Sequence, residues 1–311
     1  MVFDGVAREA RSAVRAATVR CRAALKAMTT LVPPGLIPAR LRRSTLLAVS
    51  LSGYTIAVYV AIRYISIDHV LVDPAGSDVG KVFAAAGEAF RAGRPVYSFE
   101  GEPFFYAPPV VLLFALLSLL PYPVFFGLVL AANFAGLRYL AGSWRRVGYT
   151  FWLIPVAIVP WAGTVDLAMA AAIVLAIRRG SVALPVLFGF MKFSPLLAID
   201  MARWRRALGT IALACLATLP FAWLWPEWIG QIGRALTQPF GIVVPVPFAV
   251  RLPLGLLLVL SRRPVPRALG AVIATPAFYL HSFALFLAPI ALLVPSARPG
   301  RADDAAAAAA V

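Results

Sequence analysis

Four polar side chains interrupt or border apolar stretches of this chain: Asp78, Asp166, Lys192 and His281. Asp78 stands just before a stretch with helical spacing, where a carboxylate can cap the helix or act as a general base toward a hydroxyl group. Position alone favours the cap. Asp166 follows Gly163-Thr164 and has two interpretations as well. It is either a helix N-cap or a second polar contact that faces the same outer cavity as Asp78.

Lys192 lies in the middle of an apolar run, and a charge in such a place is costly and is a functional hypothesis by default. A lipid phosphate is the natural partner for this cation, and pairing with Asp200 is the structural alternative. His281, at the end of the stretch TPAFYLH, is a candidate for contact with a sugar or a phosphate. A single histidine among apolar residues is otherwise often a satisfied structural group.

Aromatic residues accompany these groups. Tyr97, Phe105 and Tyr106 have rings that can stack on a sugar face, and an interfacial aromatic belt explains them equally well. The two cysteines, Cys21 and Cys215, fall in a basic segment and an apolar run and do not indicate a disulfide framework. The chain has 2 histidines and no metal-ligand spacing, so we expect neither a metal nor another cofactor.

The composition sets the class of protein. Of the 311 residues, 61 % are hydrophobic and 14 % are charged, which is too apolar for a soluble domain and predicts an all-α, polytopic membrane protein. The formal net charge of +16 would suit a nucleic-acid partner. The arginines, however, lie in short clusters between apolar runs, which the positive-inside rule explains better. We therefore expect membrane lipids as partners, and no nucleic acid.

The elements before the candidate residues place them on the outer side of a membrane. Residues 1–44 read as a basic cytoplasmic segment with a helix on an anionic membrane surface, although a transit peptide has a similar composition. Residues 45–66 match one bilayer thickness, which puts the N-terminus inside and the following loop outside. That loop carries a predicted short amphipathic helix at 79–92, with Phe83 and Phe90 on its apolar face.

Further apolar runs complete a membrane domain over residues 45–297. The predicted order is a re-entrant or interfacial run at 110–120, spans at 124–140, 149–161 and 167–177, a broken helix pair at 182–201, a span at 207–225, an outer loop at 226–247, a span at 248–260, and a last pair at 269–280 and 283–294 around His281. Residues 298–311 are predicted to be a disordered tail. In this topology most basic residues are cytoplasmic, as the positive-inside rule expects.

Several motifs occur in an order that resembles one enzyme family. They are Ser77-Asp78, Ala84-Ala85-Ala86, FRAGRPVY at 90–97, FYAPP at 105–109, LLP at 119–121, GTVD at 163–166, GFMKFSP at 189–195 and TPAFYLH at 275–281. Together, over about residues 45–295, they resemble family 87 glycosyltransferases of the GT-C superfamily, which are polyprenol-phosphate-mannose-dependent α-mannosyltransferases. Thr164 stands where that family often has Gln, and Ala107 alters the usual proline context.

The resemblance implies a GT-C-like transmembrane helix bundle in the bacterial cytoplasmic membrane, with its active site on the outer face. Asp78 would be the base that deprotonates an acceptor hydroxyl, and the lipid phosphate would be the leaving group. No nucleotide sugar or essential metal is then needed. Lys192 and His281 would contact the donor, and Asp166, Tyr97 and Tyr106 are the further candidates for substrate contact.

The sequence thus leads to the hypothesis of a membrane glycosyltransferase that moves a hexose, with mannose expected, from a polyprenyl-phosphate donor to a lipid or glycan acceptor. A lipid-linked-sugar transporter or flippase is the alternative from another class. It would share Lys192 and the broken helices but would need no carboxylate base. A third alternative is a non-catalytic relative that binds the donor lipid without turnover.

Overall fold

The computed structural model describes residues 77–97, 104–151, 153–237, 246, 248–261, 263–276 and 278–293. Within these ranges the chain forms helices and no strand, which confirms the all-α prediction for this part. The predicted basic segment at 1–44, the first span at 45–66 and the tail at 298–311 lie outside the described residues.

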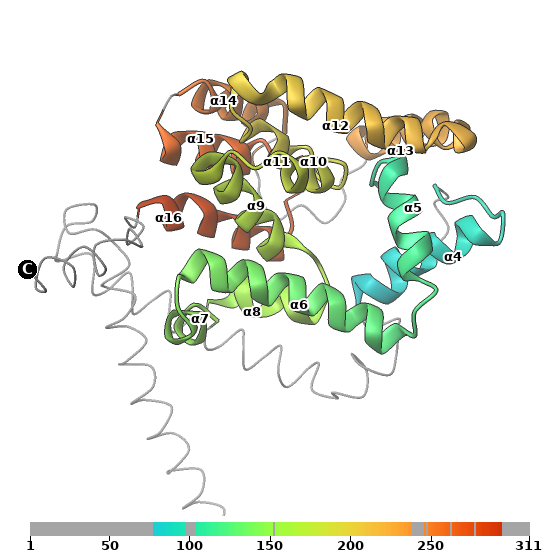
Figure 1. The fold of residues 1–311 in the computed structure, drawn as a ribbon, viewed down its shortest axis with the longest axis horizontal. Helices are drawn as coiled ribbons and strands as arrows, with labels where there is room; N and C mark the ends of the chain where they lie inside the picture. Colours follow the sequence, from blue (N-terminus) through green and yellow to red (C-terminus); the bar gives the residue numbers. More distant parts are fainter. Residues whose placement is uncertain are drawn as a thin grey trace, which may run out of the picture.

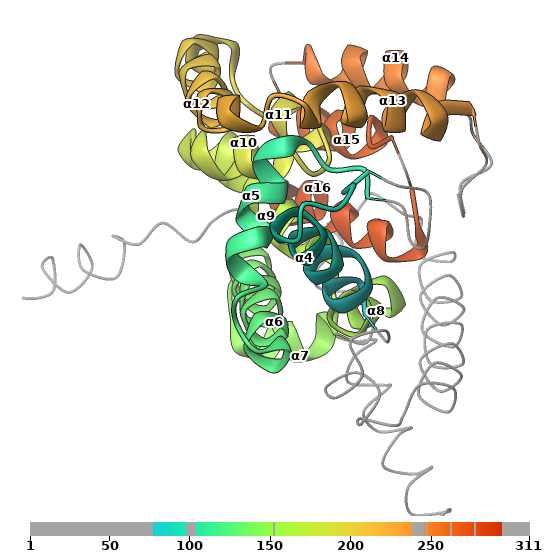
Figure 2. The same cartoon turned by 90° about the vertical axis from the view of Figure 1, so that its right-hand side faces the viewer.

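The helices follow one another with short connections. The first half contains the π-helix η2 (Val79–Ala84), α4 (Ala85–Arg91), α5 (Pro108–Leu117), α6 (Tyr122–Ala141), α7 (Trp144–Thr150), α8 (Ile154–Ala162) and α9 (Asp166–Arg179). The second half contains α10 (Ala183–Gly189), α11 (Ser194–Leu197), η3 (Met201–Arg203), α12 (Trp204–Ala217), η4 (Leu219–Phe221), α13 (Leu224–Thr237), α14 (Phe248–Val259), α15 (Pro264–Ile273), η5 (Leu280–Phe286) and α16 (Leu287–Leu293). Helices α12 and α13 lie along one edge of the bundle, and α6, α7 and α8 lie along the opposite edge (Figure 1; Figure 2).

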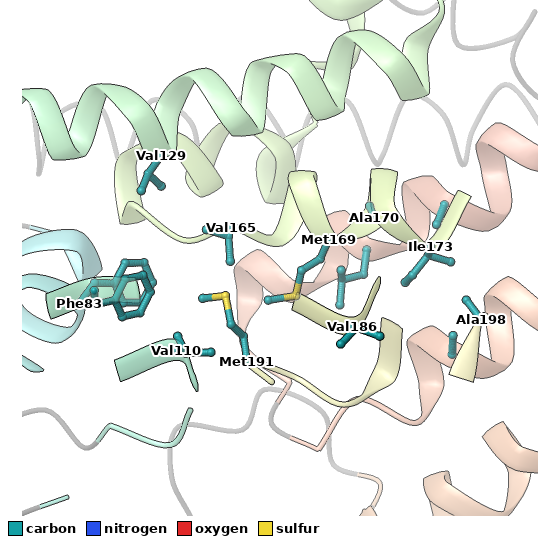
Figure 3. Close-up of a cluster of buried hydrophobic side chains, with 14 of the residues drawn as sticks. Phe83, Val110, Val129, Val165, Met169, Ala170, Ile173, Val186, Met191 and Ala198 are labelled. Atoms are coloured by element: carbon teal, nitrogen blue, oxygen red, sulfur yellow. The ribbon is translucent and has the colours of Figure 1, made fainter. Parts of the chain in front are cut away.

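Helix α9 is the centre of the bundle. Most of its side chains from Asp166 to Ala176 are buried, and it packs against α6, α10, α15 and α16. Met169 of α9 belongs to a large apolar cluster that also takes in Phe83 of η2 and Val110 of α5 (Figure 3). A helix that is apolar around its whole circumference belongs in a core. The run predicted as a span at 167–177 is therefore the element on which the others pack.

Several helix pairs approach closely at glycine. Gly136 of α6 lies against Leu167 and Ala168 of α9, where an added Cβ would come within 2.7 Å of Leu167 O. Gly255 of α14 and Gly270 of α15 lie against each other's backbones in the same way. Small residues at a crossing let two helix backbones come together, as is common between helices in membranes.

Several predicted elements coincide with observed helices. The helix predicted at 79–92 is confirmed as η2 followed by α4, with Phe83 buried and Phe90 partly buried. The broken pair predicted at 182–201 is confirmed as well, because a break separates α10 from α11. The charge of Lys192 therefore lies on non-helical backbone inside the bundle. In membrane proteins such backbone is tolerated where it is buried in protein or lines a cavity.

Several predicted elements differ from the observed ones. The span predicted at 207–225 is interrupted, because α12 ends at Ala217 and α13 begins at Leu224. The first helix of the last pair, predicted at 269–280, ends at Ile273 as α15. The span predicted at 149–161 does not exist as one helix, because α7 ends at Thr150 and α8 begins at Ile154. The outer loop predicted from residue 226 is helical over its first part, which belongs to α13. Its composition, rich in Trp and Pro, suggested a loop, but Pro226 falls in the first turn of the helix, where proline is tolerated.

Helix α6 is, among the described residues, the single helix that is long and apolar enough to cross a membrane alone. Helices α8 and α9 pass the same test only as a pair, and they are bent by 115° at the break between them. Large apolar side chains nevertheless stand on the outside of the bundle. Leu213 of α12 is 69 % exposed and Leu257 of α14 is 68 % exposed.

Candidate functional site

The carboxylate of Asp166 lies at the first residue of α9. The helix follows a turn in which Gly163 has a φ of +69°, a conformation that favours glycine. Val165 occupies the N-cap position and Asp166 makes no capping contact, so the capping interpretation of Asp166 is wrong. Its side chain is instead 1 % exposed and faces other polar groups in the core.

Lys192 is the first of these groups. Its Nζ donates to Asp166 Oδ1 at 2.7 Å and to Ser282 Oγ at 3.2 Å. The expected structural alternative, pairing with Asp200, is wrong, because Asp200 pairs with Arg267 at 3.1 Å. A lysine ammonium has three N–H donors, so one donor of Lys192 is left over from these two contacts.

His281 reaches the same carboxylate from η5. His281 Nε2 lies 3.3 Å from Asp166 Oδ2, and the imidazole stacks on the ring of Tyr279 with centroids 5.3 Å apart. The neighbouring Ser282 is fully buried, and its Oγ accepts a hydrogen bond from the Tyr279 N–H. Three non-helical breaks, before α9, after α10 and before η5, thus meet at one carboxylate.

The cluster is largely closed to solvent. The side chains of Lys192 and His281 are 11 % and 16 % exposed, so they are its accessible members. Two buried oxygens, Asp166 Oδ2 and Thr164 Oγ1, have no hydrogen-bond partner within the described part of the chain. Since buried polar atoms are normally bonded, Thr164 Oγ1 can serve a bound polar group, whereas Asp166 Oδ2 already faces His281 Nε2 at 3.3 Å.

Asn133 of α6 holds the turn that leads to Asp166. The buried Asn133 amide donates from Nδ2 to Thr164 O at 2.6 Å and to Val129 O at 3.0 Å. Its Oδ1 accepts from the Ala168 N–H at 3.4 Å, in the first turn of α9. Asn133 was not among the residues predicted from the sequence. The sequence did contain a signal for Asn133. A polar amide inside the apolar run 124–140 is costly to bury, for the same reason that singled out Lys192.

Arg251 of α14 was also missed, and it holds the turn that leads to His281. The Arg251 side chain is buried, and its guanidinium lies between the rings of Phe248 and Phe278. It donates to four carbonyl oxygens, those of Val246, Ile273, Thr275 and Pro276. An arginine in an apolar helix was again the available signal.

A hydroxyl pair joins this turn to the Lys192 break. Thr275 Oγ1 lies 3.1 Å from Ser194 Oγ, and both residues are fully buried. Because Ser194 is the first residue of α11, the contact ties the chain just after Lys192 to the chain just before His281. The contact therefore supports both Lys192 and His281.

Asp78 lies beside this cluster. It occupies the N-cap position of η2, but its side chain makes no capping hydrogen bond, so the interpretation that position favoured is not realised. Its side chain is 26 % exposed, and Oδ1 lies 3.8 Å from Lys81 Nζ. The adjacent Ser77 is buried and packs against Gly163, in the turn that leads to Asp166. The two carboxylates therefore come from neighbouring turns.

Tyr106 links the two carboxylates electrostatically. Burial, together with the negative charges of Asp78 and Asp166 and the neighbouring Tyr279, raises the pKa of Tyr106 well above its usual value. Its hydroxyl therefore remains a hydrogen-bond donor at all physiological pH values. The next N–H, that of Ala107, donates to Phe190 O at 2.9 Å, which fixes this segment beside the Lys192 break.

Tyr97 lies behind Tyr106. Its ring is 4 % exposed, and its hydroxyl donates to Tyr106 O at 2.8 Å. Tyr97 therefore supports Tyr106. Its ring has no exposed face on which a sugar could stack, contrary to the prediction for Tyr97. Phe105 O accepts a hydrogen bond from Trp228 Nε1 at 2.8 Å, so α13 braces the same segment.

The structure thus brings Asp166, Lys192 and His281 into contact and sets Asp78 and Tyr106 next to them. The arrangement offers N–H and O–H donors to an anionic or hydroxyl-bearing group, with a second carboxylate nearby to take up a proton. No group of three or more His, Cys, Asp or Glu side chains that could hold a metal ion occurs among the described residues. Comparison of the chain with known protein families, curated proteins and solved structures found no match.

Proposed function

We propose that this protein is a membrane glycosyltransferase that moves a hexose, with mannose expected, from a polyprenyl phosphate to a lipid or glycan acceptor outside the cytoplasmic membrane. Asp78 takes the proton of the acceptor hydroxyl as that oxygen bonds to the anomeric carbon of the sugar. The bond from this carbon to the phosphate oxygen breaks, and the polyprenyl phosphate leaves. Lys192 and His281 contact the phosphate side of the donor.

One observation carries the proposal. Asp166, Lys192 and His281 converge from three helix breaks, and the turn before Asp166 packs against the residues on either side of Asp78. The N–H donor of Lys192 that has no partner among the described residues suits a phosphate oxygen, because an ammonium binds phosphate as a point charge. The Asp78 carboxylate is 26 % exposed, which suits a general base that must reach a substrate hydroxyl.

The outer surface supports a membrane location. Exposed leucines line α12 and α14, and large apolar surfaces of this kind mark membrane or protein contacts. Asn133, Lys192 and Arg251 are polar groups within otherwise apolar segments, and each has bonding partners inside the bundle. Polar groups of membrane-embedded helices face inward for the same reason.

The test is transfer by the purified full chain. The chain in detergent or lipid nanodiscs is incubated with radiolabelled polyprenyl-phosphate mannose and lipid acceptors, and the labelled glycolipid is separated and counted. Asp78→Asn should lower the rate about a hundredfold or more, as loss of a general base does. Glu88→Gln is the matched control, because Glu88 is an exposed carboxylate in the following helix α4.

Equal loss in the Asp78 and Glu88 variants would mean that outer-loop charge, and not a base at position 78, matters. Full transfer by Asp78→Asn would remove Asp78 from the catalytic role. Folding of each variant is checked by its thermal unfolding midpoint, so that a misfolded protein is not counted as inactive.

A lipid-linked-sugar transporter is the second candidate. The buried Asp166–Lys192 pair at a break between α10 and α11 favours it, because transporters place coupled charges at broken helices. A transporter forms no new glycosidic bond but moves labelled donor lipid across the bilayer of a proteoliposome. A protein that does neither, and yet binds the donor lipid, would be a non-catalytic relative.

A further inference from the structure

Three arginines at one end of the bundle each pack over an aromatic ring. Arg138 lies over Trp144 at 5.8 Å. Arg145 lies over the ring of Tyr149 at 5.9 Å, and Arg145 Nε donates to the hydroxyl of the same tyrosine. Arg179 lies over the ring of Tyr139 at 5.6 Å. One face of each guanidinium is thereby fixed on a ring, and its edge keeps N–H donors for an outside acceptor.

These pairs form one continuous rim. Tyr139, the partner of Arg179, adjoins Arg138 in the last turn of α6, so the C-terminal ends of α6 and α9 lie side by side. The rim continues to Arg203, whose guanidinium packs directly on Gly180, the residue that ends α9. We call this set, with the exposed neighbours Arg146, Arg205 and Arg206, the arginine rim.

Among the described residues, no carboxylate lies within ion-pair distance of Arg138, Arg145 or Arg179. Asp200, the acid beside Arg203, is already paired with Arg267 at 3.1 Å. Trp144, beside Arg138, is 65 % exposed, and an exposed indole next to cationic groups is typical of the interfacial region of a bilayer. The rim therefore combines fixed cations with an aromatic side chain that partitions to lipid headgroups.

We propose that the arginine rim binds the headgroups of acidic phospholipids in the bilayer leaflet that it faces. The charge and the planar donors match a phosphodiester with a further negative or hydroxyl-bearing group, and the exposed Trp144 matches the headgroup–acyl boundary. This surface is separate from the Asp166 cluster, and the inference stands whether or not the protein transfers sugar.

The experiment measures lipid binding by the full chain in a neutral detergent. Dissociation constants are determined for fluorescent short-chain phosphatidylglycerol and phosphatidylcholine. We expect tighter binding of phosphatidylglycerol, and a Arg145→Gln/Arg179→Gln double variant should bind it about thirtyfold more weakly, because each basic residue at a membrane surface contributes about fivefold. Binding of phosphatidylcholine should not change.

Two further double variants serve as controls. Arg91→Gln/Arg94→Gln removes the same charge from the chain around the end of α4, away from the rim, and should keep the wild-type preference. Arg145→Lys/Arg179→Lys keeps the charge but loses the planar fork, so its affinity should lie between those of the wild type and the glutamine variant. Circular dichroism of every variant confirms that helices are retained.

Three outcomes would overturn the inference. The first is equal affinity for the two lipids, or equal loss in the Arg91/Arg94 control. The second is displacement of phosphatidylglycerol by an equimolar amount of inorganic phosphate, which would indicate a site for the free anion. The third is tighter binding of a short oligonucleotide than of phosphatidylglycerol at physiological salt, which would indicate a nucleic-acid surface.

Discussion

Lys192 and Asp166 are 26 positions apart in the chain, and the Lys192 Nζ lies 2.7 Å from Asp166 Oδ1 inside the bundle. Their side chains are 11 % and 1 % exposed. The pair sits at the meeting point of two helix breaks, so each charge is held by backbone that no continuous helix could supply. Such a pair is costly to assemble and more costly to break.

Removing one partner should therefore destabilise the protein strongly. Lys192→Met leaves a buried carboxylate without its cation, and we expect a loss of about 3–5 kcal/mol in the free energy of unfolding. The Asp166→Asn/Lys192→Met double variant should lose clearly less than the sum of the two single variants, because neither charge remains. Unfolding in mixed micelles measures all three. Additive losses would show that the two side chains do not act as a pair.

Arg251 should matter through its four carbonyl partners. Arg251→Gln leaves several buried oxygens unsatisfied, and we expect a loss of more than about 3 kcal/mol of stability, with Arg251→Lys intermediate. Arg205→Gln, at an exposed position of α12, should stay within about 0.5 kcal/mol of the wild type. The measurement is thermal unfolding in detergent. Similar midpoints for the Arg251 and Arg205 variants would contradict the structural role.

Two glycines of α6 provide a matched pair. Gly136→Ala puts a Cβ within 2.7 Å of Leu167 O, so the α6–α9 contact must open, at a cost of about 1–3 kcal/mol. An added Cβ at Gly127 meets nothing within 4 Å, so Gly127→Ala should be neutral or stabilise by up to about 1 kcal/mol. Opposite signs of the change in unfolding free energy are expected. Equal effects would rule out close packing at Gly136.

Asp200 should contribute a pH-dependent part of the stability. The Ala202 N–H and the Arg267 guanidinium hold the pKa of Asp200 below its usual value. A carboxylate whose pKa is lower in the folded state stabilises the fold above its unfolded pKa, and this contribution disappears as the pH falls through the folded pKa. Asp200→Asn should therefore lower the unfolding temperature at neutral pH but not in strong acid. A pH-independent difference between the two proteins would count against this assignment.

The sequence predicted the helical class, the surface helix before α5 and the broken pair around Lys192, because apolar periodicity and the cost of a buried charge are local signals. It did not predict α13, since Trp and Pro there suggested a loop while the proline in fact falls in the first turn. Nor could it pair Lys192 with Asp166. Asp200 is closer in sequence, and only the folding of α9 against α10 decides between the two.

The same limit explains the residues that were missed. Asn133 and Arg251 each stand alone in an apolar helix, so sequence shows that they need partners but not which ones. The partners are backbone carbonyls of the turns at 164 and 273–276, whose positions depend on the Gly163 turn and on the end of α15. Backbone acceptors carry no sequence signature.

The π-helical segment that follows Asp78 has a consequence of its own. A π-helix holds more residues in each turn than an α-helix and often appears at functional sites. The direction in which the Asp78 carboxylate points about the helix axis thus depends on the number of residues between Asp78 and α4, and not on their identity. Deleting a single codon from this segment would therefore turn the acid to another side of the helix.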